Sequence, residues 1–531
     1  MTIKRWILVA LTAIALLFMG ADLVASLGKP QFQGRLTLSE SDLRLHFVEW
    51  QGQPDSTAQA LRELLGESRP VESALEEYST AKKIAAEDLN NAQKELKQLK
   101  QADTAPENIL EKLADKSRSE QIADLEAQVS KKQKSQDELD LRLGLLYRIK
   151  PKATAEDLQK SAQLWQGLQN NPATTAKIAQ TAAVLSGLWQ TSPQLLPQAE
   201  SLIQQNLDGW YRYRSLERFY ELSQQKAELN NLNAAEQATA ERVITRLGFS
   251  SLFSALTLLG GSVLLLSVGI QRLVRGQKSL LAGIQNSQWA VPWDWETTWW
   301  VVIVGFFFVG QFLTGNFLGP ILTFSLQSIL APLVSRDLLQ ALSVLIGYLC
   351  LAGGASTVLY QTLKSYSSLE KNWFRLSLKG NWWLWGLGSY LTVFPLIVGV
   401  NLINQAIWQG KGGSNPLLDI LLNGRDPLAL VIFFVVTAIA APVFEEFFFR
   451  GFLLPSLTRY MSAWNAILLS SLIFALVHLS LSEVLPLTTL GIVLGFVYTR
   501  TQNLLASMLL HSLWNSGTLI SLFILGNASH G

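Results

Sequence analysis

Hydrophobic positions are distributed unevenly along the chain, with a polar first half and an apolar second half. After an apolar run at 6–18, residues 28–247 are polar and rich in glutamine, alanine, leucine, lysine and glutamate. About 20 apolar residues suffice for a helix to cross a bilayer. Such runs lie near 249–270, 298–322, 338–361, 382–404, 428–449, 463–480, 485–499 and 503–525. The pattern predicts an all-α fold, a polytopic transmembrane helix bundle with a large extra-membrane helical domain.

The polar half contains two hydrophobic seams with alternating spacings of three and four residues. The first runs through Leu75, Tyr78, Lys82, Ala85, Leu89, Ala92, Leu96 and Leu99, with one polar interruption. The second, less regular seam runs through Ile122, Leu125, Val129, Leu139, Leu143 and Leu146. Heptad-like seams are typical of coiled coils. With turn-forming residues at 103–108 between them, they predict an antiparallel coiled-coil hairpin at about 70–147.

The first 27 residues resemble a membrane anchor or a signal peptide. Lys4 and Arg5 precede the apolar run, and the small residue Ala25 is a poor cleavage site because Leu23 stands two positions before it. We favour an uncleaved anchor. The predicted organisation is therefore an anchor at 1–27, a helical domain at 28–247, membrane helices at 248–426 and a separate membrane core at 427–531.

Basic residues gather after alternate apolar runs, which predicts the orientation of the chain. They are Arg272, Arg275 and Lys278, then Lys364, Lys371, Arg375 and Lys379, then Arg450 and Arg459, and finally Arg500. Lysine and arginine are enriched in cytoplasmic loops of membrane proteins. We therefore expect an integral multi-pass protein of a bacterial plasma membrane or an internal or organellar membrane. Residues 28–247 would lie on the non-cytoplasmic side.

Composition narrows the function classes. Hydrophobic residues make up 49% of the 531 residues, and the net charge of +2 gives no sign of a nucleic-acid partner. Cys350 is the single cysteine, so an intrachain disulfide and a thiolate metal site are both excluded. Tryptophans cluster at 293–300 and 382–385, where apolar runs begin, as in the aromatic belts of membrane interfaces.

Two adjacent glutamates lie inside the apolar run at 428–449. Glu445 and Glu446 precede three phenylalanines and Arg450. Ionisable groups at this depth cost a few kcal/mol each, so they usually face a bundle interior and serve a function. Glu446 and Arg450 are four residues apart and can pair on one helix face, while Glu445 points elsewhere. A structural interpretation, in which the pair only marks a helix end, leaves Glu445 unexplained.

Two histidines follow in later apolar runs. Phe474 and His478 share one helix face, as do His511 and Asn515. A single histidine on an apolar helix is more often a packing residue than a catalyst, and an asparagine there often bonds a neighbouring helix. Their depths favour chemistry, because Glu445 and His478 lie about 25 Å from a shared turn near Ser462. We expect the acids and both histidines to meet in one intramembrane pocket.

The motifs EExxxR at 445–450, FxxxH at 474–478 and HxxxN at 511–515 together resemble the CPBP family of intramembrane proteases. That family includes endoproteases of CAAX prenyl proteins and bacterial relatives linked to bacteriocin processing. The resemblance covers about the last 100 residues and not 28–247. It implies Glu445 as the base that activates water, with Glu446 and Arg450 supporting it. It further implies that His478 positions the water, and that His511 with Asn515 stabilises the oxyanion.

The resemblance also raises the question of a metal. Members are commonly called metalloproteases, and Glu445, His478 and His511 form a ligand set that suits Zn²⁺. The compact HExxH zinc signature is not among these motifs, and a metal-free glutamate mechanism fits the same residues. The sequence leaves both open. In either case the partners are the lipid bilayer and a membrane-associated peptide or protein substrate.

The sequence leaves two other functions open. A membrane scaffold would recruit a protein partner through residues 28–247, and would not need the acids and histidines. A transporter or proton relay would use buried glutamate and histidine, but such folds are built from inverted repeats, which the sequence does not display. We therefore expect an intramembrane endopeptidase with glutamate-activated water.

Overall fold

The computed structural model describes residues 2–52, 60–61, 65, 69–101, 109–284, 289–366, 373–424 and 426–528. The described residues form helices and no strands, with one isolated bridge between Pro30 and Lys411. This confirms the predicted all-α class. The expected turn at 103–108 and the basic residue Lys371 lie outside the described residues.

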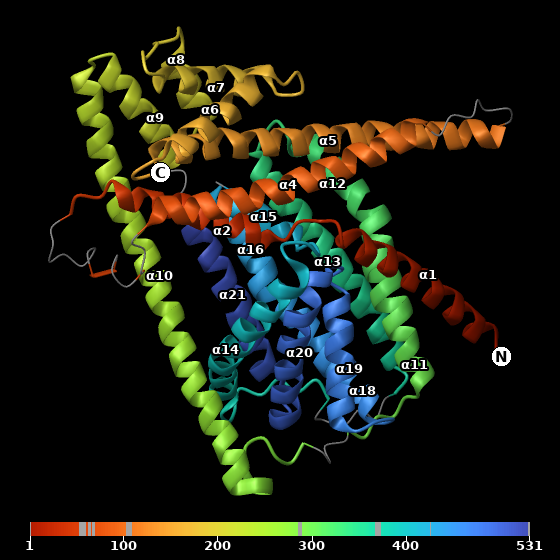
Figure 1. Ribbon diagram of the computed structural model, residues 1–531. Coiled ribbons are helices and arrows are strands. Elements are labelled where there is room, and N and C mark those ends of the chain that lie inside the picture. Colours follow the sequence, from red (N-terminus) through yellow and green to blue (C-terminus); the bar gives the residue numbers. More distant parts are fainter. Residues whose placement is uncertain are drawn as a thin grey trace. The chain divides into compact units, whose positions relative to one another are not determined.

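The chain divides into two compact units, each with its own helices (Figure 1). We call residues 1–32 and 252–526 the membrane unit, and residues 33–251, with 527–531, the helical unit. The helical unit contains α2 (Phe32–Leu45), η1 (His46–Val48), α4 (Pro70–Gln101), α5 (Ile109–Ile149), α6 (Ala155–Asn170), α7 (Ala176–Leu188), α8 (Ala199–Asn206), α9 (Gly209–Leu222) and the first part of α10 (Lys226–Arg275).

Helices α4 and α5 lie against each other in the helical unit (Figure 1). Two ion pairs join them, Lys82 Nζ to Asp140 Oδ1 at 2.7 Å and Lys100 Nζ to Glu126 Oε1 at 2.5 Å. Because the residue number rises along α4 while it falls along α5, the helices run antiparallel. The seam leucines Leu89, Leu143 and Leu146 are buried, and the supercoil itself stays a prediction.

The membrane unit holds the long apolar helices. In chain order after α10 these are η2 (Gly276–Lys278), α11 (Trp295–Trp300), η3 (Val301–Leu318), α12 (Gly319–Leu330), α13 (Arg336–Leu363), α14 (Trp382–Trp408), α15 (Pro416–Asn423), α16 (Pro427–Phe434), η4 (Val435–Ala440), α17 (Ala441–Glu445), η5 (Glu446–Leu453), α18 (Leu454–Thr458), α19 (Ala463–Leu476), α20 (Leu481–Thr501) and α21 (Leu504–Ala528). The first helix of the chain, α1 (Ile3–Ser26), also belongs here.

Eight described helical stretches are long and apolar enough to cross a membrane. They are Ile3–Ser26, Lys226–Lys278, Trp295–Leu330, Arg336–Leu363, Trp382–Trp408, Pro427–Thr458, Leu481–Thr501 and Leu504–Leu525. The protein is therefore an integral multi-pass membrane protein, as predicted. The apolar run at 463–480, which was expected to form a membrane helix, is not among these eight stretches. Its helix, α19, ends at Leu476 and is shorter than they are. Its chain turns at Leu479, where φ is +56°, so α19 cannot continue.

The first helix packs on the wall formed by α11 and η3. Arg5 Nε donates to Glu296 Oε2 at 2.8 Å, and Trp299 Nε1 donates to Thr12 Oγ1 at 2.9 Å. The rings of Phe18 and Phe312 lie 5.0 Å apart. These contacts extend over most of α1, from its polar start to its apolar second half, so the helix is an integral part of the membrane unit.

Three segments of the membrane unit wind as π-helix rather than α-helix. Two of them, η4 and η5, lie on either side of the short α17 within the single stretch Pro427–Thr458. Short π-helical turns inside α-helices are frequent at functional sites. The winding changes at the boundary between Glu445, which ends α17, and Glu446, which begins η5. Successive residues of a helix point about 100° apart, so the two adjacent carboxylates face different directions.

Candidate functional site

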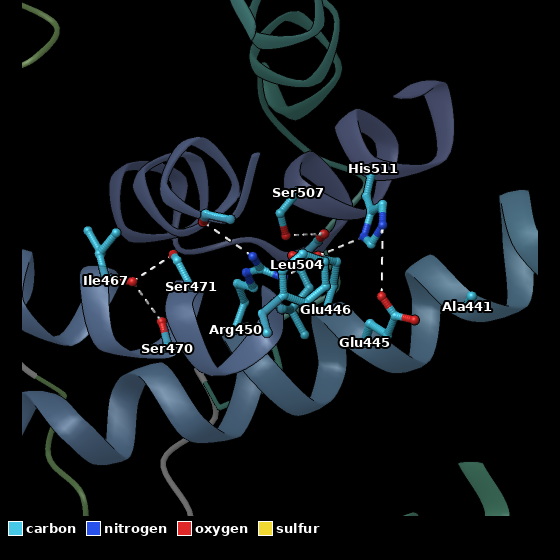
Figure 2. A network of polar contacts seen from close by, with 12 residues as sticks. Ala441, Glu445, Glu446, Arg450, Ile467, Ser470, Ser471, Leu504, Ser507 and His511 are labelled. Carbon is cyan, nitrogen blue, oxygen red and sulfur yellow. Dashed lines mark hydrogen bonds and ion pairs between the residues drawn. The ribbon is translucent and has the colours of Figure 1, made fainter. Parts of the chain in front are cut away.

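Glu446 and Arg450 form an ion pair that is fully enclosed by the membrane unit (Figure 2). Arg450 Nη1 donates to Glu446 Oε1 at 2.7 Å, and the two side chains are 1% and 0% exposed. Arg450 Nη2 also donates to the Gly491 carbonyl of α20 at 3.2 Å. A Cβ at position 491 would lie 2.8 Å from Ser471, so glycine permits the close packing of α19 and α20 that brings this carbonyl into place.

His511 of α21 joins the two glutamates (Figure 2). Its Nδ1 lies 3.0 Å from Glu446 Oε1, and its ring is 3% exposed. Because an ionised carboxylate only accepts, Nδ1 is the nitrogen that carries the proton toward Glu446. The opposite ring nitrogen, Nε2, then faces Glu445 Oε2 at 3.9 Å. Glu446 thus fixes which edge of the imidazole faces the other acid.

Glu445 differs from Glu446 in both exposure and partners. Its side chain is 18% exposed, and its carboxylate makes no hydrogen bond to any described residue. The contact with His511 Nε2 is too long for a hydrogen bond and leaves the carboxylate's lone pairs accessible. The two acids therefore have separate surroundings, one neutralised and enclosed, the other reachable.

Phe474 lies at the centre of the predicted site residues. The guanidinium of Arg450 stands over its ring at 4.6 Å, and the ring meets His511 edge-on at 5.7 Å. The ring of His478 lies 5.1 Å from the same phenylalanine. An aromatic face attracts the cation and excludes water from the pair behind it. Phe474 thus brings the arginine and both histidines together around one ring.

His478 lies just beyond the end of α19, not on the helix as the sequence predicted. Its Nδ1 is 2.8 Å from the carbonyl oxygen of Phe474. A carbonyl only accepts, so Nδ1 donates this hydrogen bond and Nε2 is the ring nitrogen that it leaves free. The side chain of Gln311, from η3, donates to the carbonyl of Val477 at 3.1 Å and supports this turn. The rings of His478 and Phe474 are in contact even though His478 is not part of the helix.

Asn515 bonds a neighbouring helix. Its Nδ2 donates to the Thr437 carbonyl in η4 at 2.8 Å. In a π-helix the donor to this carbonyl would come from residue 442, but Pro442 has no N–H. The amide of Asn515 therefore satisfies an acceptor that the proline leaves open. This bond joins the helix that carries His511 to the helix that carries Glu445 and Glu446.

Two further polar side chains border the site and were missed by the sequence reasoning. The hydroxyl of Tyr348, on α13, lies 3.4 Å from the Ala441 carbonyl and within electrostatic range of Glu445. Glu483 on α20 lies within electrostatic range of His478 and accepts the Asn415 N–H at 2.8 Å. Glu483 could have been found by the argument used for Glu445, an acid in an apolar run. Tyr348 carries no such signal.

The donor set around Glu445 bears on whether the site can hold a metal. The described residues hold no group of three His, Cys, Asp or Glu side chains that could bind an ion. Glu445 and His511 Nε2 approach each other, while Glu446 is bound to Arg450. His478 Nδ1 is bound to a carbonyl, as is usual for a metal-binding histidine, and this leaves its Nε2 free. Zinc sites in enzymes use three protein ligands. A zinc site formed by Glu445, His478 and His511 therefore stays a prediction.

The arrangement offers a carboxylate with free lone pairs beside an imidazole that a second, neutralised carboxylate orients. A partly buried base next to an oriented histidine is suited to activating water and to stabilising a developing negative charge. The surrounding rings of Phe306, Phe444, Phe448 and Phe449 are packed against one another and keep this space apolar. Electrostatic interactions are stronger in such surroundings than in water.

Known proteins and one family model are similar to the part of the chain that contains this site. A family model described as type II CAAX prenyl endopeptidase Rce1-like matches residues 427–517, which include every predicted site residue. The UPF0177 protein YxdF of Lactococcus lactis is 30% identical over 143 residues, which are 27% of this chain and 75% of that protein.

A second relative carries a functional description. The putative membrane peptidase YdiL of Bacillus subtilis is 26% identical over 140 residues, 26% of this chain and 55% of that protein. The chain thus spans about half the length of this relative. No solved structure matches the chain.

Proposed function

The chain belongs to the CPBP family of membrane proteases, and on that premise we propose that it is an intramembrane endopeptidase in which Glu445 activates water. The observation that carries this proposal is the difference between the two acids in burial and in hydrogen-bond partners. Glu446 is enclosed and bound to Arg450 and His511, whereas the Glu445 carboxylate faces His511 with its lone pairs available.

The chemistry follows from this division. Glu445 takes a proton from water, and the resulting hydroxide attacks the carbonyl carbon of the peptide bond. The carbonyl becomes a tetrahedral oxyanion. Glu445 then returns the proton to the leaving nitrogen, and the C–N bond breaks. A positioned general base of this kind contributes about 10²- to 10⁴-fold to the rate.

His511 is the oxyanion donor in this scheme. Glu446 holds the ring at Nδ1, so Nε2 faces the space in front of Glu445, where the oxyanion forms in this scheme. In the proposed reaction Nε2 carries the hydrogen that the oxyanion accepts. Preorganised donors aimed at developing charge are among the largest contributions to catalysis.

The remaining predicted residues receive supporting roles. His478, through its free Nε2, accepts a hydrogen bond from the attacking water and so positions it, while Glu445 takes the other proton. Phe474 holds the two histidines and Arg450 in register. Asn515 acts through the Thr437 carbonyl, as a positioning residue that holds α21 against the helix of the acids.

A metal-free reaction is part of the proposal. Its support is the donor set, in which Glu445 and His511 face each other without a third ligand. In a zinc enzyme these two would be the residues to hold the ion, which would supply Lewis-acid activation of water. The substrate is a peptide or protein within the bilayer. The non-cytoplasmic location of residues 28–247 and a protein partner bound there stay predictions.

The test compares the membrane peptides of cells that carry different forms of the gene. Wild-type, Glu445→Gln and deletion strains are analysed by mass spectrometry for peptides with new termini in membrane segments. The proposal expects uncleaved substrate to accumulate in both the Glu445→Gln and the deletion strain. The substitution keeps the shape of the side chain and removes the base.

Glu241→Gln is the matched control. It makes the same acid-to-amide change at an exposed position of the helical unit, and its peptides should match wild type. If the Glu445→Gln strain also matches wild type while the deletion strain differs, the chain acts without this base. The endopeptidase proposal is then wrong, and a scaffold function through 28–247 is favoured.

A further inference from the structure

A cavity of about 270 Å³ lies where the chain leaves the end of α10 and turns back towards the start of α19 (Figure 1). Its wall is formed by Arg272 of α10, Gln277 of η2, the segment 281–284 and Trp464 of α19. All of these residues belong to the membrane unit. None of them takes part in the proposed protease site, so the cavity is a separate feature of the molecule.

The segment after α10 is folded back and fixed at both ends. The side chain of Gln271 accepts the N–H of Leu280 at 2.9 Å, which ties this segment to the last turn of α10. Further along, Ile284 is 1% exposed and belongs to the same buried cluster as Ile467 of α19 and Tyr498 of α20. The end of α10 is thereby joined to the helix bundle, and the cavity lies at this junction.

Two guanidinium groups from different helices meet at this cavity. Arg272 is partly exposed and forms no ion pair with a described residue. Arg500 of α20 likewise has no carboxylate partner among the described residues, and a Cβ built on the wall residue Gly283 would lie 3.8 Å from its Nη1. Residues 248–293 contain no aspartate or glutamate. The cavity therefore combines two accessible positive charges that no described acid neutralises.

Position in the wall distinguishes Arg272 from its neighbours. Basic residues at the end of a membrane helix are common and require no specific ligand. Arg275 and Lys278 are of this ordinary kind, because both are exposed and neither lines the cavity. Arg272 differs in facing an enclosed space that a second guanidinium also borders.

The cavity lies at the level where the bilayer ends. The apolar stretch of α10 runs to Ile270, and Arg272 follows within about 3 Å of helix rise. Trp464, whose ring stacks on Phe496 at 6.1 Å, is a residue type enriched at membrane interfaces. The membrane stretch of α10 is only 11% buried inside the protein, so most of its surface faces lipid. Lipid head groups therefore lie beside the cavity.

Phosphate is the anion that this arrangement suits. Each guanidinium presents several N–H donors in a plane, a geometry that matches phosphate oxygens in pairs. Basic pockets between membrane helices are known to bind phosphate-bearing head groups. Small-molecule sites usually measure about 300–1,000 Å³, so a cavity of about 270 Å³ fits a head group rather than a whole lipid.

We propose that this cavity binds a phosphate group, with Arg272 and Arg500 as its counter-charges and Gln277 as a further donor. The group has two sources, the head group of an anionic phospholipid or a soluble phosphate. Once bound, it would link the end of α10 to α19 and α20. This inference does not depend on peptide-bond hydrolysis.

The experiment uses the purified full chain in detergent. Native mass spectrometry measures the affinity for dioleoylphosphatidylglycerol, and dioleoylglycerol, which has the same chains without phosphate, is the matched ligand control. Isothermal titration calorimetry measures binding of glycerol 3-phosphate and inorganic phosphate. Binding of the phospholipid alone identifies a lipid site, and binding of the soluble ligands identifies a soluble-phosphate site. Either result supports the proposal if dioleoylglycerol binds less tightly and Arg272 is required.

Arg272→Gln is the test variant, and it should weaken binding by about 10- to 100-fold, as expected for lost hydrogen bonds to a charged group. Arg500→Gln is a second test variant with the same expectation, so the result does not depend on the folding of one protein. Arg275→Gln is the control, the same change one turn further along α10 and outside the cavity wall. It should weaken binding by less than about fivefold, the effect of one basic residue near an anionic surface.

Three results would overturn the proposal. One is the absence of binding of the phospholipid and of both soluble phosphates at millimolar concentration by wild type. Another is equal affinity for dioleoylphosphatidylglycerol and dioleoylglycerol, which would show that the acyl chains alone are recognised. The third is equal weakening by Arg272→Gln and Arg275→Gln, which would indicate unspecific attraction to the basic end of the membrane unit.

Discussion

Removal of one partner of the Glu446–Arg450 pair should lower the free energy of unfolding strongly. Apolar replacement of both partners should lower it much less. Both side chains are almost completely enclosed, and one Glu446 oxygen receives both Arg450 Nη1 and His511 Nδ1. Glu446→Leu leaves the guanidinium buried without its carboxylate. Loss of one partner of a buried ion pair lowers the free energy of unfolding by about 3–5 kcal/mol.

The double variant Glu446→Leu/Arg450→Met should recover most of that loss. Apolar replacement of a whole buried pair is often neutral or stabilising. The double variant still leaves the Gly491 carbonyl without its donor, an unpaired buried group that costs about 1–3 kcal/mol. Its free energy of unfolding should therefore lie within about 3 kcal/mol of wild type, and above that of Glu446→Leu.

The assay is equilibrium unfolding of the purified chain by SDS in mixed micelles, followed by tryptophan fluorescence. Both single variants and the double variant complete a double-mutant cycle, whose coupling energy should reach about 3 kcal/mol. The double variant should nevertheless be inactive, because His511 has lost the acceptor that orients it. Additive losses in the cycle would show that the two side chains are not coupled, and would refute the reasoning.

Three further predictions concern other parts of the chain. Asn515→Leu should lower the free energy of unfolding by roughly 0.6–1.7 kcal/mol in the same titration, the range for one hydrogen bond between membrane helices; an unchanged value would contradict its bond to η4. Tyr348→Phe should reduce kcat about five- to tenfold with KM unchanged, and an effect on KM alone would argue against a role at Glu445. In the helical unit, the backbone N–H of Thr154 and the ammonium of Lys150 lower the pKa of Asp157 to about 2, below its ordinary value of 3.8. The stabilisation by Asp157 should thus be complete above pH 4 and disappear as the pH falls through about 2, so the stability difference between wild type and Asp157→Asn, followed by circular dichroism, should vanish in acid.

Much of the fold follows from sequence period and length. Apolar runs of about 20 residues specify membrane helices because the bilayer core requires that length. The run at 463–480 shows where this reasoning fails. Its hydrophobicity continues to residue 480, but the helix ends at Leu476, and Leu479 takes a left-handed conformation. Hydropathy contains no information on such a backbone turn, because it records side-chain character and not dihedral angles.

The arrangement of side chains around His511 could be predicted only in part from the sequence. The four-residue spacing of Glu446 and Arg450 predicts their pairing, which the structure contains. The contacts of His511 with Glu446 and Glu445 join residues 65 and 66 positions apart and depend on packing of α21 that no local pattern specifies. The bond of Asn515 to Thr437 depends on Pro442, and it is visible only when the π-helical winding around the proline is known.

The most direct test of the central claim is the rate of cleavage by the reconstituted chain in metal-free buffer. A substrate identified from the membrane peptides is incubated with wild type and Glu445→Gln in proteoliposomes, with a strong chelator present. The account predicts that wild type keeps its full rate and that Glu445→Gln loses about 10²- to 10⁴-fold, the contribution of a general base. Loss of wild-type activity in chelator with recovery on added Zn²⁺, or full activity of Glu445→Gln, would contradict it.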